Sequence, residues 1–269
     1  MSIRMPGKDV SIVIPTYNEA KNIEPLFSRI CDSLDGYDWE VLFVDDNSPD
    51  GGSEIARSLS LRDDRVRLIL RVFDRGLANA CIQGLLSAKS DVLCVMDGDG
   101  QHDPKYIPAL IGPILAGEYD IVSAARSLDE PSTEGALAPW RIKLSKIGNS
   151  FASAVLGRKI QDPLTGFFAI RRASFIPVAP DLQDPGFKIL LDILVADKGL
   201  RHIETPFKFR TRHHGESKLD SYAMWQFAMF LLSKLTHGIV PARLISFLIV
   251  GGSVRSTDVC RGSPILSVV

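Results

Sequence analysis

The first hundred residues alternate between short apolar runs and longer segments whose apolar residues fall three and four positions apart. The short runs predict buried strands, which lie at 10–14, 40–44, 66–70 and 91–96. The longer segments predict helices packed through one face, which lie at 19–34, about 52–60 and about 76–88. This alternation predicts an α/β fold, a mostly parallel sheet with helices on both faces.

The second half of the chain is less regular. Strands are predicted at 119–123, 167–170 and about 201–209. Helices are predicted near 140–156 and at 186–199. A loop of small and charged residues precedes the first of these helices, and a basic loop at 210–218 follows the last strand.

Residues 222–254 are strongly apolar, but charged residues and Pro241 divide them into pieces of about 11–12 residues, short of the ~18–20 that a transmembrane helix needs. They favour helices that lie on a membrane, with Tyr222 and Trp225 at headgroup level. The alternative is a pair of helices docked on the globular core. We expect three parts: a catalytic domain at 1–220, a membrane-associating segment at 221–254, and an irregular, truncated end at 255–269.

Composition restricts the class of protein. The 269 residues are 45% hydrophobic and 23% charged, which is typical of a folded globular chain and excludes a disordered or fibrous one. A net charge of -1 gives no reason to expect a nucleic-acid partner. The four cysteines form no CxxC pair and predict reduced thiols in a cytosolic setting. The N-terminus lacks the apolar core of a signal peptide.

Polar clusters follow three of the predicted strands. They run from Thr16 to Glu19, from Asp45 to Asp50 and from Asp97 to Asp103. Ligands of parallel α/β sheets bind beyond the carboxyl ends of the strands. The sequence therefore predicts one polar, acidic crevice that is built from three strand ends.

Asp97 and Asp99 lie two residues apart on a glycine-rich turn, and Gln101 offers a further oxygen. Mg²⁺ and Mn²⁺ prefer such oxygen ligands, and a cation shared with a diphosphate needs only one or two carboxylates. Such an ion would neutralise a departing diphosphate. The alternative is a solvated acidic turn.

The other two strand ends offer nucleotide contacts. Asp45 and Asp46 suit a second ion, or a ribose or base held by hydrogen bonds. Tyr17 offers a flat face to a nucleobase, and Glu19 offers an acceptor for base N–H groups. The alternative for residues 18–19 is that they simply begin the first helix.

Three segments together, VSIVIPTYNEAKNI, EVLFVDDNSPDGG and VLCVMDGDGQHDP, resemble glycosyltransferase family 2, the inverting enzymes with the GT-A fold. Four later segments, RGLANACIQGL, DPLTGFFAIRR, GFKILLDIL and RTRHHGESKL, resemble its dolichol-phosphate (polyprenol-phosphate) mannosyltransferase group. The resemblance covers about residues 10–220. The phosphate loops GxGxxG and GxxxxGK[ST] are absent.

The resemblance implies individual roles. The nucleotide would be held by Pro15, Tyr17, Glu19, Val44 and Asp46. The predicted nucleotide-sugar site consists of these five residues together with Asp45, Asp97, Gly98 and Asp99. The metal ligands would be Asp97, Asp99 and Gln101, and the acceptor phosphate would meet Arg126, Arg141 and Ser145. Arg212 and Lys218, with Asp99, would act at the reaction centre. Arginine and lysine suit phosphate oxygens whatever the family. We assign no role to His102, His213 or His214.

The expected reaction follows from this resemblance. It is transfer of a hexose, mannose from GDP-mannose, onto a polyprenyl phosphate at the cytoplasmic face of a membrane. The alternatives are UDP-glucose or another donor with the same acceptor, and a non-catalytic, truncated membrane protein that keeps the fold. A soluble nucleotidyltransferase is disfavoured, because it would not need the apolar tail. The chain departs from the common DADLQ form of the metal turn by reading DGDGQ, which loosens the turn but keeps its ligands.

Overall fold

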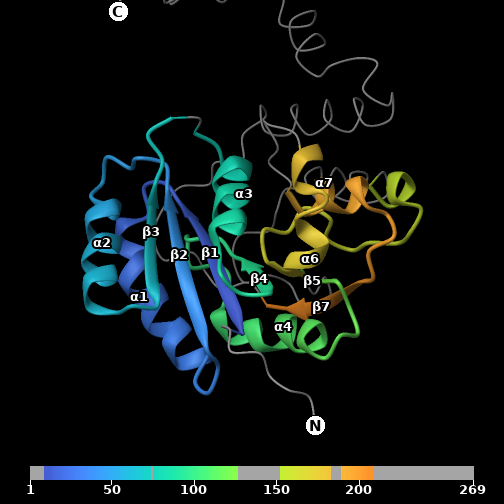
Figure 1. Ribbon diagram of the computed structural model, residues 1–269, viewed down its shortest axis with the longest axis horizontal. Coiled ribbons are helices and arrows are strands. Elements are labelled where there is room, and N and C mark those ends of the chain that lie inside the picture. The colour runs from blue at the N-terminus through green and yellow to red at the C-terminus, as the bar shows by residue number, and fades with distance from the viewer. Residues whose placement is uncertain (1–8, 74, 127–151, 183–188, 209–269) are drawn as a thin grey trace, which may run out of the picture. The chain divides into compact units, whose positions relative to one another are not determined.

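A computed structural model of the chain describes residues 9–73, 75–126, 152–182 and 189–208. Within them lies a seven-stranded sheet in the order β3-β2-β1-β4-β6-β5-β7 (Figure 1). The strands are β1 (Val10–Thr16), β2 (Trp39–Asp45), β3 (Val66–Leu70), β4 (Val92–Val95), β5 (Ile121–Arg126), β6 (Phe168–Arg171) and β7 (His202–Phe207). Strand β6 is antiparallel to both neighbours, and the other adjacent pairs are parallel. The predicted mostly parallel sheet is confirmed.

The main helices are α1 (Ala20–Ser33), α2 (Gly52–Arg62), α3 (Leu77–Ser87), α4 (Ile107–Leu115) and α7 (Ile189–Ala196). Shorter turns of helix are η1 (Pro104–Tyr106), α6 (Arg172–Phe175) and η2 (Ala179–Asp181). Residues 152–156, the end of the helix predicted near 140–156, are helical, and the rest of that segment lies outside the described residues.

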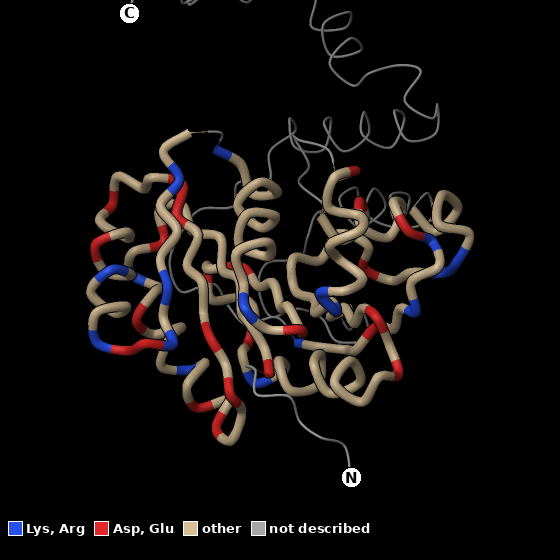
Figure 2. The backbone as a smooth tube through the Cα atoms, viewed as in Figure 1, with Lys and Arg blue, Asp and Glu red and all other residues tan. Residues whose placement is uncertain are grey.

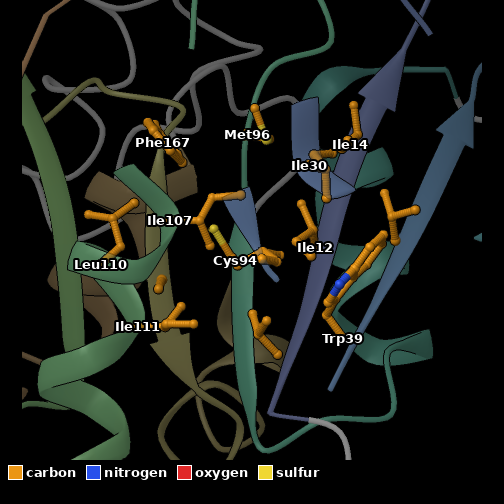
Figure 3. Packing of buried hydrophobic residues seen from close by; sticks show 14 of the residues in the cluster. Ile12, Ile14, Ile30, Trp39, Cys94, Met96, Ile107, Leu110, Ile111 and Phe167 are labelled. Carbon is orange, nitrogen blue, oxygen red and sulfur yellow. The ribbon is translucent and has the colours of Figure 1, made fainter. Parts of the chain in front are cut away.

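The helices cover both faces of the sheet, so the domain has three layers. Helices α1, α2 and α4 enclose the larger core, where Ile12 and Ile14 of β1 meet Ile30 of α1 and Trp39 of β2 (Figure 3). Helix α3 packs on the opposite face, where a Cβ added at Gly84 would lie 2.3 Å from Val13. Alternate side chains of a strand point to opposite faces, so β1 serves both cores. This burial on both faces explains the continuous apolar runs of the sequence.

Helix α4 is the main element that the sequence patterns did not predict. Its nine residues include Pro108, Gly112 and Pro113. Proline and glycine disfavour a helix interior, so the sequence here does not read as a helix. Ile107, Leu110, Ile111 and Ile114 are nevertheless fully buried and anchor the helix under β4, β5 and β6. The helix follows the acidic turn after β4 through η1, so it fixes the base of that turn.

The predicted membrane segment at 221–254 and the end at 255–269 lie outside the described residues. No helix of the described part of the chain is long and apolar enough to cross a membrane. Basic and acidic residues are both spread over the described part of the chain, although the charged residues from Asp32 to Glu54 are all acidic (Figure 2). Three of the four cysteines, Cys31, Cys81 and Cys94, lie within the described residues and are free thiols there.

Candidate active site at the strand ends

The ends of β2, β1 and β4 lie side by side. Thr16 pairs with Asp45 in the β1–β2 register, and Asp46 N donates to Thr16 O across 3.1 Å. On the other side of β1, Gly98 packs so closely that an added Cβ would lie 3.2 Å from Thr16 Cγ2. The second polar cluster is therefore joined to the first by a backbone hydrogen bond, and the third packs against the first at Gly98.

Asp45 is a buried structural acceptor. Its side chain accepts hydrogen bonds from Thr16 Oγ1 at 3.0 Å, Ser53 Oγ at 2.8 Å, and Ser48 N and Oγ at 2.8 and 2.6 Å. The residue is 1% exposed. These bonds tie the end of β1 and the start of α2 to the end of β2, so Asp45 shapes the loop that carries the next residues. Its predicted contact with a nucleotide stays a prediction.

Asp46 forms a buried ion pair with Arg71, which directly follows β3. Arg71 Nη1 lies 2.5 Å from Asp46 Oδ1, and Gly76 N donates to Asp46 Oδ2 at 2.8 Å. Arg71 was not among the predicted site residues, although its position at a fourth strand end is a signal that could have found it. The pair fastens the β3–α3 loop to the predicted nucleotide site.

Asp50 links the first turns of two helices. Its Oδ2 accepts from Ala20 N of α1 at 2.8 Å, and its Oδ1 accepts from Gly52 N of α2 at 3.0 Å. Asn18 and Asn47, on the same two loops, both have left-handed backbone angles, with φ of 60° and 58°. Asparagine tolerates this region better than most residues. The loops after β1 and β2 are thus locked to each other.

Tyr17 and Glu19, the predicted base contacts, differ in their surroundings. Tyr17 is 37% exposed, and the Arg75 guanidinium carbon lies 5.8 Å from its ring centroid. The Glu19 carboxylate accepts from Asn22 Nδ2 at 2.6 Å, so it lies against the first turn of α1. Pro15 and Val44 are paired, buried strand residues beneath the loops. An open ring beside a cation suits a nucleobase, and the four assignments stay predictions.

The acidic turn after β4 presents the three predicted metal ligands. The Asp97 side chain is 38% exposed, and Asp99 Oδ1 accepts from Gln101 N at 3.0 Å. Gly100 has φ of 77°, a left-handed conformation that favours glycine. Among the described residues, no three His, Cys, Asp or Glu side chains converge as a metal site. Two carboxylates and an amide are nevertheless the donor set expected for a cation that a diphosphate shares, so these residues fit one.

Gly166 brings a distant loop against this turn. A Cβ at residue 166 would lie 2.7 Å from Asp97 Oδ1 and 3.0 Å from Oδ2, so only glycine leaves the carboxylate in its place. Gly166, Thr165 and Asp97 share a small cavity with residues of α3, Cys81 among them. Burial raises the pKa of the Cys81 thiol well above its usual range, with the Asp97 and Asp46 charges adding to the effect. Cys81 is therefore a thiol, not a nucleophilic thiolate, at neutral pH.

Of the residues predicted to bind the acceptor phosphate or to act on charge at the reaction centre from the basic loop, only Arg126 lies within the described residues. Arg126 ends β5, where its backbone pairs with Phe207 of β7. Arg141, Ser145, Arg212 and Lys218 lie outside the described residues, so their roles stay predictions.

This arrangement of strand ends agrees with what similar proteins show. Residues 11–178 match glycosyl transferase family 2, and the chain belongs to that family. It is therefore a glycosyltransferase, as the sequence predicted.

Three relatives within this family show which group of its enzymes the chain is similar to. The chain is 38% identical to a dolichol-phosphate mannosyltransferase of Pyrococcus furiosus, over 90% of this chain and 68% of the relative. It is 31% identical to one of Saccharomyces cerevisiae, over 89% and 92%. A polyprenol monophosphomannose synthase of Mycolicibacterium smegmatis is 32% identical, over 80% and 82%. The predicted resemblance to this group is confirmed.

Solved structures support the fold. Glucosyl-3-phosphoglycerate synthase of Mycobacterium tuberculosis, solved with Mn²⁺, UDP-glucose and phosphoglyceric acid, superposes with a TM-score of 0.63. The two proteins share 20% identity over 86% of this chain and 80% of that one. The likeness confirms the predicted GT-A-type fold.

Proposed function

We propose that this protein transfers mannose from GDP-mannose onto a polyprenyl phosphate, with inversion at the anomeric carbon. The observation that carries the proposal is the identity of 31–38% with dolichol-phosphate mannosyltransferases over most of the chain. The strand-end site supports it, because an exposed aromatic ring, buried carboxylates and an acidic turn lie along one edge of the sheet.

The donor nucleotide would lie across the ends of β1 and β2. Tyr17 presents its ring to the base, and the loop that carries Asp46 is rigid because Asp45 and Arg71 hold it. A rigid loop loses little entropy when it binds a ligand, which supports affinity for the nucleotide.

Asp97, Asp99 and Gln101 would hold Mg²⁺ or Mn²⁺ beside the diphosphate. The bound ion would supply a positive charge that stabilises the departing nucleotide. The residues of the chain orient that charge: Gln101 N fixes the Asp99 carboxylate, and Gly166 lets the Asp97 carboxylate lie against the neighbouring loop.

The acceptor side needs no strong base. The second pKa of a phosphate monoester is about 6, so the acceptor is mostly a dianion at neutral pH and is already a competent nucleophile. One acceptor oxygen forms the new bond to the anomeric carbon as the bond to the nucleotide breaks on the opposite face. Arg126, Arg141 and Ser145 would position that phosphate, and Arg212 and Lys218 would stabilise charge at the reaction centre.

A lipid acceptor implies a membrane surface, and we propose the cytoplasmic face. Residues 222–254, with their apolar pieces and Tyr222 and Trp225, would lie on the bilayer. Deletion of 222–269 should leave nucleotide binding intact while it weakens vesicle binding and use of long-chain acceptors. Full vesicle binding and full activity after the deletion would contradict this part of the proposal.

The donor is tested with the purified full-length chain, Mg²⁺ or Mn²⁺, polyprenyl phosphate and a panel of radiolabelled sugar nucleotides. We expect label to enter the lipid phase from GDP-mannose, and much less from UDP-glucose. Transfer from UDP-glucose at the higher rate would change the donor but keep the acceptor. No transfer from any donor would contradict the proposal.

A further inference from the structure

His102 is a buried ring directly behind the acidic turn. It is 2% exposed, and its ring stacks on Phe167 at a centroid distance of 5.0 Å and an angle of 19°. Phe207 of β7 meets the same ring edge-on at 5.8 Å. Two aromatic side chains, one directly before β6 and one at the end of β7, therefore fix the orientation of the imidazole.

One ring nitrogen of His102 accepts a hydrogen bond from the backbone of Asp97. In the sheet, Met96 N donates to Val13 O, and this is where β4 leaves β1. The next amide, Asp97 N, donates instead to His102 Nδ1 at 3.0 Å. The histidine thus replaces a backbone partner at the point where the chain turns away from the sheet, and buried N–H groups need such a partner.

The other nitrogen of the ring lies near the Asp97 side chain. Because Nδ1 accepts a hydrogen bond, the neutral ring carries its proton on Nε2. Nε2 lies 3.7 Å from Asp97 Oδ2, which is beyond direct hydrogen-bond distance but close enough for an electrostatic interaction with the carboxylate. On another side, Gly166 lies against the same carboxylate.

We infer that His102 is a positioning residue, which holds Asp97 in the orientation needed to bind a divalent cation beside a nucleotide diphosphate. This inference rests on the proposed function, because it takes Asp97 as a cation ligand. The ring would not touch the ion, and acts through the backbone and the carboxylate of Asp97. Removing such a partner of a ligand typically lowers metal affinity 10–100-fold.

Three substitutions distinguish the contributions of the two ring nitrogens from the contribution of aromatic packing. His102→Phe keeps an aromatic ring against Phe167 but has neither nitrogen. His102→Asn places an amide oxygen near the position of Nδ1, and His102→Gln extends its amide toward that of Nε2. His202→Phe is the matched control, because this half-buried histidine lies five residues before Phe207 on β7, roughly 16 Å along the strand.

The measurement is the Kd of Mn²⁺ for each full-length variant, by electron paramagnetic resonance with and without GDP, beside its thermal unfolding. We expect His102→Phe to bind Mn²⁺ about 10–100-fold more weakly, with most of the affinity restored in His102→Asn. His102→Gln should recover less, because the direct hydrogen bond is the one to Nδ1. His202→Phe should lower the unfolding temperature and leave the Kd unchanged.

Two results would overturn the inference: unchanged Mn²⁺ affinity in His102→Phe, or an equal loss in His102→Phe and His102→Asn. If His102→Phe does not fold, the comparison of His102→Asn with His102→Gln still decides, and a weaker Kd in the asparagine variant contradicts the role of Nδ1. Failure of the unaltered chain to bind Mn²⁺ would contradict the metal site itself. Transfer of mannose by the unaltered chain tests the proposed function separately.

Discussion

Arg71 Nη1 lies 2.5 Å from Asp46 Oδ1, and the two side chains are 4% and 10% exposed. Gly76 is bound to both partners, because its N–H donates to Asp46 and its carbonyl accepts from Arg71 at 3.2 Å. The pair therefore closes the loop between β3 and α3 onto the end of β2. An Asp46 held in this way has a structural role in addition to the predicted contact with the nucleotide.

Loss of either partner should destabilise the fold. Asp46→Ala and Arg71→Ala each leave a buried charge without its counterion, and such a loss costs about 3–5 kcal/mol. The double variant should lose less than the sum, because no single charge is left behind. Asp46→Ala should also raise the KM for the donor more than it lowers kcat. Urea unfolding and steady-state kinetics measure the two effects.

The exposed pair Arg62–Glu24 is the control for this prediction. Its side chains are both 60% exposed, so its removal should change the free energy of unfolding by no more than about 1 kcal/mol. If the buried pair cost no more than this exposed one, the account of Asp46 and Arg71 would be wrong.

Gly166→Ala should impair the acidic turn without unfolding the protein. The new Cβ would meet the Asp97 carboxylate, which can swing aside, whereas no backbone atom is among its nearest neighbours. We expect weaker Mn²⁺ binding and a lower kcat with little change in the unfolding temperature. Gly112→Ala is the control, because a Cβ there meets nothing within 4 Å and should stabilise α4 by up to about 1 kcal/mol. Unchanged Mn²⁺ binding in Gly166→Ala would show that the contact between Gly166 and Asp97 does not contribute to the metal site.

His202 should make stability depend on pH. Burial, with the positive charge of Arg158, lowers the pKa of His202 to about 4. In the unfolded chain the imidazole takes up a proton near pH 6.5, so between about pH 6.5 and 4 the unfolded state binds more protons and stability falls as pH falls. At pH 4.5 the loss should reach about 2–3 kcal/mol.

The contribution of His202 is isolated by comparison with His202→Phe, since carboxylates titrate in the same range in both proteins. The advantage of the unaltered chain over the variant in unfolding free energy should shrink between pH 7 and 4.5. Parallel pH profiles would show that His202 does not remain neutral in the folded protein.

Arg212→Ala and Lys218→Ala should each reduce kcat strongly with little effect on donor binding. Both residues are predicted to stabilise charge on a transferring phosphate, and such clamps act mainly in the transition state. Calorimetry with GDP and single-turnover kinetics separate the two steps. Arg210→Ala, in the same basic loop, should change kcat less. An undiminished kcat in Arg212→Ala and Lys218→Ala would place both outside the reaction centre.

The sheet could be predicted because its strands are short, apolar on both sides and followed by turn residues. Predicted strand 66–70 agrees with β3, and the bounds of β1 and β2 differ by two residues or fewer. Helix α4 was not predicted, because its prolines interrupt the helical sequence pattern. Its burial against β4, β5 and β6 stabilises the helix in spite of them.

Site residues could be predicted only where they directly follow a predicted strand in the sequence. Arg71 directly follows β3, so its place at the site could have been predicted, but its pairing with Asp46 could not. The roles of His102 and Gly166 depend on contacts with residues of other elements, and local patterns carry no record of them. His102 was set aside because its neighbours are better candidate ligands, and its packing on Phe167 and Phe207 is a property of the folded sheet. The same holds for Asp45, whose four hydrogen bonds make it a structural acceptor.

The central claim is that the three strand ends form a metal-dependent site for sugar transfer to a lipid phosphate. It is tested most directly by the rate at which label from GDP-mannose enters polyprenyl phosphate, for the unaltered chain with Mn²⁺, with EDTA, and for Asp99→Ala. We predict transfer with Mn²⁺, its reversible loss in EDTA, and its loss in a folded Asp99→Ala, because the charge that stabilises the leaving diphosphate is removed. Undiminished transfer in EDTA or in Asp99→Ala would contradict the account.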